Sequence, residues 1–97
     1  MSSSSGPRPL GAVLNELIDR LGYRQPLEEA RAVEAWPVLA GPAVAGVTEA
    51  VWMRNGQLFV KVKSAAWRHQ LHLQRDGWRR RLNQHLGREV VDEVVFR

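Results

Sequence analysis

The sequence predicts an α+β domain, with the element order α-α-β-β-α-β, in which a three-stranded sheet has its helices packed on one face. Three observations predict this fold. Apolar residues recur at helical spacing near the N-terminus, two strand-like runs flank Asn55-Gly56, and a long helical pattern precedes a β-branched C-terminal run. A chain of 97 residues can bury one modest core but not two, so a single domain is expected.

The N-terminal part of the chain predicts a helix after a short leader. Residues 1–8 are rich in Ser, Gly and Pro, so we expect a disordered leader followed by one domain over residues 9–97. A helix is predicted from about Pro9 to Leu21, where Gly22 can adopt the left-handed conformation that ends a helix. Its apolar face consists of Leu10, Val13, Leu14, Leu17, Ile18 and Leu21.

A second helix is predicted from Pro26 to about Ala35 or Trp36. Proline is well tolerated in the first turn of a helix, and two glutamates follow it at the positive end of the helix dipole. Pro37 disfavours helical geometry at Trp36, so the helix is expected to end or kink there. Residues 41–46 are expected to form a connector with room for a short helical turn.

A β-hairpin is the clearest local prediction. Residues 47–54 and 57–63 are strand-like, and Asn55-Gly56 between them suits the positive φ angles of a type I′ turn. The two-residue loop pairs Arg54 with Gln57, Met53 with Leu58, Trp52 with Phe59, Val51 with Val60 and Ala50 with Lys61. Strand alternation then places Val51, Met53, Leu58, Val60 and Val62 on one face and Trp52, Arg54, Phe59, Lys61 and Lys63 on the other.

A long helix and a third strand complete the predicted fold. Ser64 suits the N-cap of a helix over residues 65–86, in which Gly77 permits a bend and which Gly87 ends. Its apolar stripe consists of Trp67, Leu71, Trp78, Leu82 and Leu86. We expect Trp67, Leu71 and Trp78 to share a core with Val60 and Val62 of the hairpin. The β-branched residues 90–97 predict the third strand, with Val94 and Phe96 on one side.

The charge is unevenly distributed along the chain. Residues 1–50 carry four Arg and six acidic residues, whereas residues 51–97 carry eight Arg, two Lys and four acidic residues. The second half therefore has a net charge of +6, which favours an anionic partner. The absence of cysteine excludes disulfides and thiolate catalysis. Neither a signal peptide nor an apolar stretch of membrane-spanning length is present, so we expect a cytoplasmic protein without a membrane partner.

The polar face of the hairpin is the first candidate site. Aromatic rings stack on the bases of single-stranded nucleic acid, while Arg and Lys contact the phosphates. The candidate nucleic-acid-binding residues of this face are Trp52, Arg54, Phe59, Lys61 and Lys63. An alternative is that the two rings are buried beneath the N-terminal helices or face a protein partner.

A row of cations on the long helix is the second candidate. Arg68, His72, Arg75 and Arg79 follow one another at helical spacing, and Arg80 and Arg81 add to the positive charge. We call these six residues the basic ridge. Its arginines at positions 68, 75, 79 and 80 are candidate phosphate contacts, because a polyanion would relieve the repulsion among them. The alternative is a solvated helix face that Asp76 balances.

Catalytic sites are poorly supported by the sequence. His69, His72 and Asp76 could share a helix face, but they are too few for a closed metal site. The glycines at 41 and 46 have the spacing of a phosphate-binding loop, but Val47 stands where that loop requires Lys. We therefore expect no enzyme activity, no cofactor, no metal and no small-molecule substrate.

Several short motifs, in their order and spacing, resemble the DciA family. They are Trp36 followed by Gly41, the hairpin over residues 55–62, Ser64-Ala65-Ala66-Trp67 at the start of a helix, Leu71, Leu82-Asn83 before Leu86-Gly87, and the ending Val94-Val95-Phe96-Arg97. The resemblance covers about residues 10–97. It implies a KH-like fold that binds the bacterial replicative helicase, binds single-stranded or double-stranded DNA, and promotes helicase loading.

The chain differs from KH domains in one feature and from many relatives of the DciA family in another. It lacks the Gly-x-x-Gly loop with which KH domains hold a nucleic-acid backbone, so that mode of contact is not expected. It also ends at the third strand, whereas many relatives continue into a flexible tail. Two other functions stay open: a protein-protein adaptor whose aromatic residues anchor a partner, and an RNA-binding module.

Overall fold

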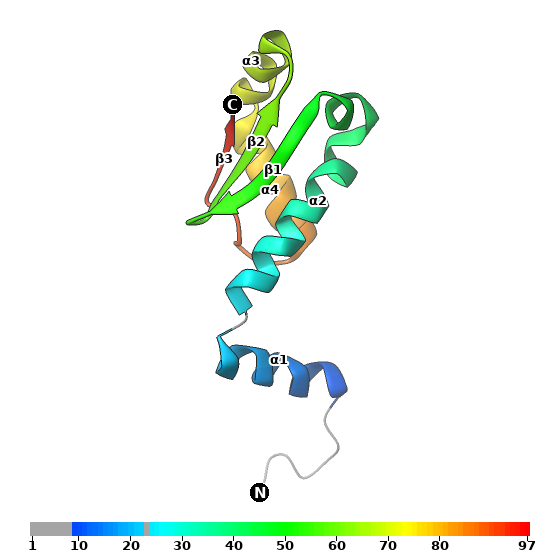
Figure 1. Cartoon of the computed structure of the whole chain (residues 1–97). Helices are drawn as coiled ribbons and strands as arrows, with labels where there is room; N and C mark the ends of the chain where they lie inside the picture. Colours follow the sequence, from blue (N-terminus) through cyan, green and yellow to red (C-terminus); the bar gives the residue numbers. More distant parts are fainter. Residues whose placement is uncertain (1–8, 23) are drawn as a thin grey trace, which may run out of the picture.

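The computed structural model describes residues 9–22 and 24–97, and the leader expected at residues 1–8 lies outside the described residues. The chain forms α1 (Leu10–Leu21), α2 (Arg24–Gly46), β1 (Thr48–Arg54), β2 (Gln57–Val62), α3 (Ala65–Leu73), α4 (Arg75–Leu86) and β3 (Glu93–Phe96). The fold is therefore α+β, as predicted, with one more helix than the predicted order contains. Figure 1 shows α1 lying away from the sheet, at the far end of α2.

The strands form one mixed sheet in the order β1-β2-β3. β1 and β2 are antiparallel in the predicted register, with Trp52 opposite Phe59 and Arg54 opposite Gln57, so that prediction is confirmed. Asn55 and Gly56 have φ angles of 52° and 79°, as the tight turn requires. β3 runs parallel to β2, because the chain crosses over through α3 and α4 before it returns to the sheet.

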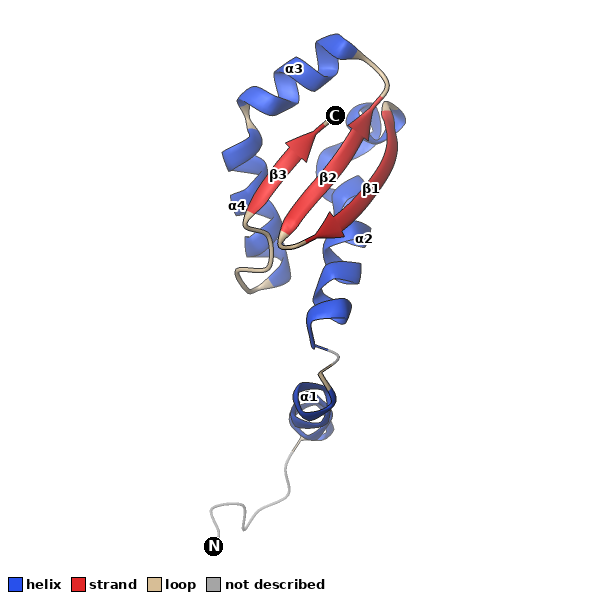
Figure 2. Ribbon diagram, turned by 60° about the vertical axis from the view of Figure 1, so that its left-hand side comes forward, coloured by secondary structure: helices blue, strands red, loops and turns tan. Residues whose placement is uncertain are grey.

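The core lies between one face of the sheet and the helices α2 and α4, which cover that face in Figure 2. Trp36 of α2 is fully buried, and its ring centroid lies 5.0 Å from that of Trp78 in α4 and 5.6 Å from that of Phe96 in β3. Leu58, Val60, Val62 and Val94 fill the core from the sheet. The helices therefore leave the other face of the sheet uncovered.

The second helix is longer than predicted. It continues past Pro37 to Gly46, and the only non-helical backbone inside it is at Gly41, with φ 85° and ψ 170°. Pro37 removes a single backbone donor, whereas the burial of Trp36 and Val44 holds the helix against the sheet on both sides of it. The prediction that the helix ends or kinks at Pro37 was wrong, and the kink lies four residues later.

The predicted long helix is divided in two. Gln74, with φ −104° and ψ 13°, separates α3 from α4, so the break lies three residues before Gly77. The change of direction takes α3 out of line with the apolar stripe of α4. Leu71 and Trp78 stay buried with Val60 and Val62, but Trp67 is 38% exposed. The prediction of Trp67 in the shared core was wrong.

The cap of α3 is the predicted one, because Ser64 accepts a hydrogen bond from the Trp67 amide.

The helix α1 forms where it was predicted, but its apolar face is exposed. Leu10, Val13, Leu14, Leu17 and Leu21 are each between 45% and 73% exposed. The core of the sheet is thus built without α1.

Candidate nucleic-acid interface

The uncovered side of the sheet, which we call the open face, carries the side chains that alternate with the core positions. They are Ala50, Trp52 and Arg54 of β1, Gln57, Phe59 and Lys61 of β2, and Glu93, Val95 and Arg97 at β3. Strand pairing brings these residues together from three parts of the chain (Figure 2). Trp52, Arg54, Phe59 and Lys61 of the first candidate site therefore lie on one surface, whereas Lys63 follows the end of β2.

An aromatic row crosses the open face. Trp52 and Phe59 are directly paired, and their rings are nearly parallel at 11°, with centroids 5.5 Å apart. The guanidinium of Arg97 lies 4.7 Å from the centre of the Phe59 ring. Phe59 is consequently only 7% exposed, whereas Trp52 is 36% exposed. Trp52 is thus the ring that can stack on a base, and Phe59 supports it from the side.

Phe59 is buried, but the N-terminal helices do not bury it. The side chains that cover it, Trp52 and Arg97, belong to the open face itself. Arg97 was not among the candidate residues, because a C-terminal arginine gives no signal of its own. Its position follows from the parallel pairing of β3 with β2, which is extended by one residue when the Arg97 amide donates a hydrogen bond to the Val60 carbonyl.

The cations of the open face have few acidic partners. Lys61 lies 3.6 Å from Glu49, and both side chains are solvent-exposed, so the pair contributes little. Glu93 accepts a hydrogen bond of 2.6 Å from the Gln57 side chain. Arg54 and Lys63 are exposed, and neither forms an ion pair within residues 9–22 and 24–97.

The basic ridge is not continuous. Arg68 and His72 belong to α3, whereas the other four residues belong to α4, and the break at Gln74 lies between them. Arg75 bridges this break, because its guanidinium donates a hydrogen bond of 2.9 Å to the His72 carbonyl and lies 3.3 Å from His72 Nε2. The helical spacing that suggested a single row therefore does not hold along its full length.

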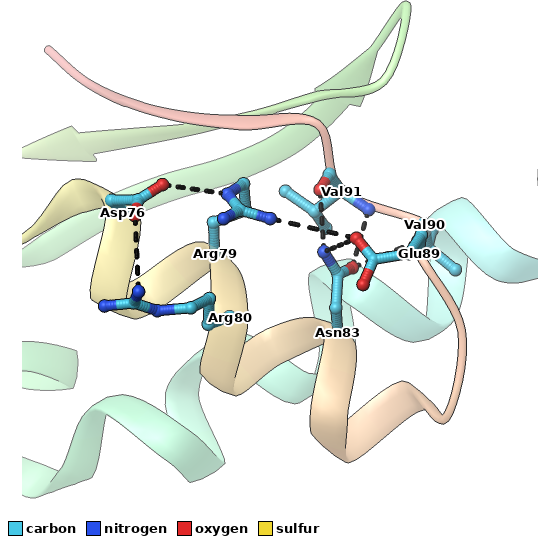
Figure 3. Close-up of polar contacts among 7 residues, drawn as sticks. All are labelled: Asp76, Arg79, Arg80, Asn83, Glu89, Val90 and Val91. Atoms are coloured by element: carbon cyan, nitrogen blue, oxygen red, sulfur yellow. Dashed lines mark hydrogen bonds and ion pairs between the residues drawn. The ribbon is translucent and has the colours of Figure 1, made fainter.

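Two arginines of α4 are held by acidic side chains (Figure 3). Arg79 Nε donates to Asp76 Oδ1 at 3.0 Å, and its Nη1 lies 3.8 Å from Glu89. Arg80 Nη1 lies 3.7 Å from the other oxygen of Asp76. The hydrogen bond from Arg79, with the charges of Arg79 and Arg80, lowers the pKa of Asp76. This part of the ridge is largely neutralised.

Arg81 faces a different direction. It donates a hydrogen bond of 2.9 Å to the Leu39 carbonyl of α2, and its guanidinium lies 4.4 Å from the centre of the Trp78 ring. The hydrogen bond to Leu39 connects α4 to α2, whereas the contact with Trp78 lies within α4. Arg81 therefore contributes to the packing of α4 against α2.

Asn83 is a structural residue that the sequence patterns did not single out for a role. It is 4% exposed, and its Oδ1 accepts hydrogen bonds from the amides of Val90 and Val91 at 3.0 and 2.8 Å. Its Nδ2 donates to the Val91 carbonyl at 2.8 Å and to Glu89 at 3.2 Å (Figure 3). Asn83 thereby holds the loop that leads into β3. The available signal was a polar residue inside the apolar stripe, directly after Leu82.

Other kinds of site find little support in the described parts of the chain. In those parts, no three His, Cys, Asp or Glu side chains lie close enough together to hold a metal ion. His69, His72 and Asp76 therefore do not form such a group. The α3–α4 junction and the start of β3 enclose a hollow of about 410 Å³, whose lining mixes Arg75 and Arg79 with three acidic side chains. Among the described helices, none combines the length and the apolar character needed to cross a bilayer.

Fold and surface together define a class: a small α+β domain with one sheet face covered by helices and the other face open, aromatic and cationic. The family model described as "Dna[CI] antecedent, DciA" matches residues 9–96. The chain belongs to the DciA family, and the resemblance found in its motifs is confirmed.

Curated relatives come from Mycobacterium leprae. The UPF0232 protein MLBr00004 of strain Br4923 and the UPF0232 protein ML0004 of strain TN are each 33% identical to this chain over 67 residues. The matched region makes up 69% of this chain but only 35% of each relative. The chain thus spans about a third of the length of the curated relatives it matches.

Proposed function

We propose that this domain is a non-enzymatic accessory factor of bacterial DNA replication. In this proposal it binds DNA on the open face, binds the replicative helicase, and promotes loading of the helicase. Its place of action is the cytoplasm, at the nucleoid. Membership of the DciA family supports the link to helicase loading, and the surface of the domain supports the contact with DNA.

The observation that carries the DNA contact is the surroundings of Trp52. An indole that is 36% exposed lies on a flat sheet face, with Phe59 packed beside it and Arg97 beyond. Bases of single-stranded DNA can stack on the indole, while Arg54, Lys61 and Lys63 reach the phosphates on either side. Duplex bases are already stacked, so we expect single strands to bind more tightly than duplex.

The basic ridge has a secondary role in this proposal. Arg68 and Arg75 are further candidate phosphate contacts, whereas Arg79 and Arg80 must first leave Asp76. Giving up two exposed ion pairs costs little individually, so a polyanion could recruit both arginines at close range. Their contribution should nevertheless be smaller than that of the open face.

Binding of labelled oligonucleotides tests this proposal. Fluorescence anisotropy with a single-stranded oligonucleotide and the matching duplex, repeated over a range of salt, should show a tighter single-strand complex and affinity that falls as salt rises. Arg54→Ala should weaken binding, whereas the charge-matched control Arg31→Ala, at an exposed position of α2, should not. Equal effects of the two variants would contradict the assignment of the open face.

A protein-protein adaptor is the second candidate function. The exposed Trp67 at the start of α3 and the exposed leucines of α1 favour it, since both are apolar surfaces without a cover in the described chain. An adaptor would bind the helicase and have negligible affinity for DNA at physiological salt. The salt titration therefore distinguishes the two functions, because both predict helicase binding and only the first predicts DNA binding.

A further inference from the structure

Along its outer edge, β1 has backbone groups that find no partner among the described residues. β1 is an edge strand, because it lies at one end of the sheet order, next to β2. The two-residue turn makes Arg54–Gln57 a hydrogen-bonded pair, and in an antiparallel ladder every second pair after it is hydrogen-bonded as well. These pairs are Trp52–Phe59 and Ala50–Lys61, so the amide and carbonyl groups of Trp52 and Ala50 face β2. The amide and carbonyl groups of Val51 and Met53 therefore point outward. Proteins usually cover or disrupt such an edge, and in the described residues this edge is interrupted by a bulge near Glu49.

We infer that two copies of this domain associate through their β1 edges, antiparallel, about a two-fold axis at Trp52. A second strand can satisfy both outward residues at once, and a two-fold axis at Trp52 pairs Val51 of each copy with Met53 of the other. An axis at Val51 would instead place Met53 against the bulge at Glu49. An axis at Met53 would place Val51 against the turn residue Asn55.

Charges at the two ends of β1 complement one another in this arrangement. Arg54 of one copy lies opposite Ala50 of the other, a residue too small to block the longer side chain. Glu49 is next to Ala50, and its carboxylate reaches toward the open face, where it lies 3.6 Å from Lys61. Each Arg54 can therefore approach Glu49 of the second copy, twice per dimer.

An apolar hollow beside the β1 edge fits the same register. It has a volume of about 300 Å³ and lies between α2 and β1, where its lining includes Val33, Pro37, Ala45 and Val51. In the dimer, Met53 of the second copy lies opposite Val51 and on the helical side of the sheet. A flexible, unbranched methionine side chain is well suited to fill such a hollow.

The pairing would extend the proposed DNA surface. This consequence rests on the proposed function. In the dimer, the row formed by Arg97, Phe59 and Trp52 would continue into the same row of the second copy, in reverse order. The two indoles would meet at a pair without backbone hydrogen bonds, where side chains lie closest. A dimer would therefore offer one strand of DNA a stacking surface of twice the length.

A single introduced cysteine tests the register. The chain has no cysteine, so Trp52→Cys creates one thiol, and in the dimer the two copies would have Cα atoms about 4.5 Å apart, within disulfide range. Under mild oxidation this variant should form a covalent dimer quickly. The control Lys61→Cys, on the same face but one strand away, should do so at least about tenfold more slowly. Equal rates for the two variants would overturn the proposed axis.

Sedimentation of the unmodified domain tests the association itself, without DNA. The contact area is small, so the apparent mass should rise from monomer toward dimer between roughly 5 and 500 µM. Arg54→Glu and Glu49→Arg should each favour the monomer, and the double variant should restore the dimer. A monomer at all concentrations would overturn the inference. It would leave the proposed function intact, because that function is measured by oligonucleotide binding to one copy.

Discussion

The open face and the start of α4 each carry several cations, but their surroundings differ. On the open face, Arg54 is exposed and lies beside an exposed indole. At the start of α4, Arg79 and Arg80 share the carboxylate of Asp76, and Arg79 also approaches Glu89. Similar charge in the sequence thus has two different surroundings: the cations of one group are available to a ligand, and those of the other are paired with nearby carboxylates.

The largest effect expected on the α4 side is a loss of stability. Asn83→Ala removes the acceptor for two amides, the partly buried one of Val90 and the buried one of Val91, and leaves both donors without this partner. Each such donor costs about 1–3 kcal/mol, so the free energy of unfolding should fall by about 3 kcal/mol. Chemical denaturation measures this. The exposed neighbour Gln84→Ala should change stability by less than about 0.5 kcal/mol. A small effect of Asn83→Ala would show that the loop before β3 is held by other contacts.

The largest effect expected on the open face is a loss of binding. Trp52→Ala removes the stacking surface and should weaken single-strand binding by about 1–3 kcal/mol, while the dependence on salt stays nearly unchanged. Trp52→Phe should retain most of the affinity, because it keeps a ring at that position. If Trp52→Ala unfolds the domain instead, the indole is part of the core and the comparison between the two regions fails.

Replacing Trp67 with Ala should reduce stability less than the place of Trp67 in the apolar sequence pattern predicts. Full burial would make Trp67→Ala cost about 3–5 kcal/mol. Because the side chain is 38% exposed, the loss should stay below about 2 kcal/mol and the domain should remain folded. Thermal or chemical denaturation of this variant decides between the two values, and helicase pull-down then reports whether the exposed ring contacts a partner.

The smallest expected effect concerns Asp76. Its folded-state pKa is lowered below the ordinary value of 3.8, so its contribution to stability is present above that pH and is lost as the pH falls through the lowered value. Asp76→Asn should therefore reduce the acid sensitivity of folding slightly. It should also free Arg79 and Arg80, and so increase affinity for DNA at low salt. No gain in affinity would mean that these arginines do not reach DNA even when released.

Local signals predicted the hairpin side of the molecule well. Asn55-Gly56 determines the turn, the turn determines the register, and strand alternation then assigns Trp52, Arg54 and Lys61 to one face. Each step depends on residues close in the sequence. The burial of Phe59 could not be predicted in this way, because it depends on Arg97, which reaches the open face only through the parallel pairing of β3.

The helical side was predicted less well for the same physical reason. A continuous apolar stripe from Trp67 to Leu86 is compatible with one helix or with two, and tertiary packing divides it at Gln74. The burial of Trp36 likewise outweighs the local preference of Pro37. The role of Asn83 depends on a loop that folds back against α4, which no helical periodicity indicates.

The salt dependence of single-strand binding tests the difference between the two regions most directly. In Arg54→Ala with Lys61→Ala, two phosphate contacts should be lost, so the slope of log K against log salt should shrink by about 1.4. In Arg79→Ala with Arg80→Ala, which removes the same charge, the slope should change by less than about 0.7. A larger change for the second pair than for the first would contradict the assignment of DNA binding to the open face.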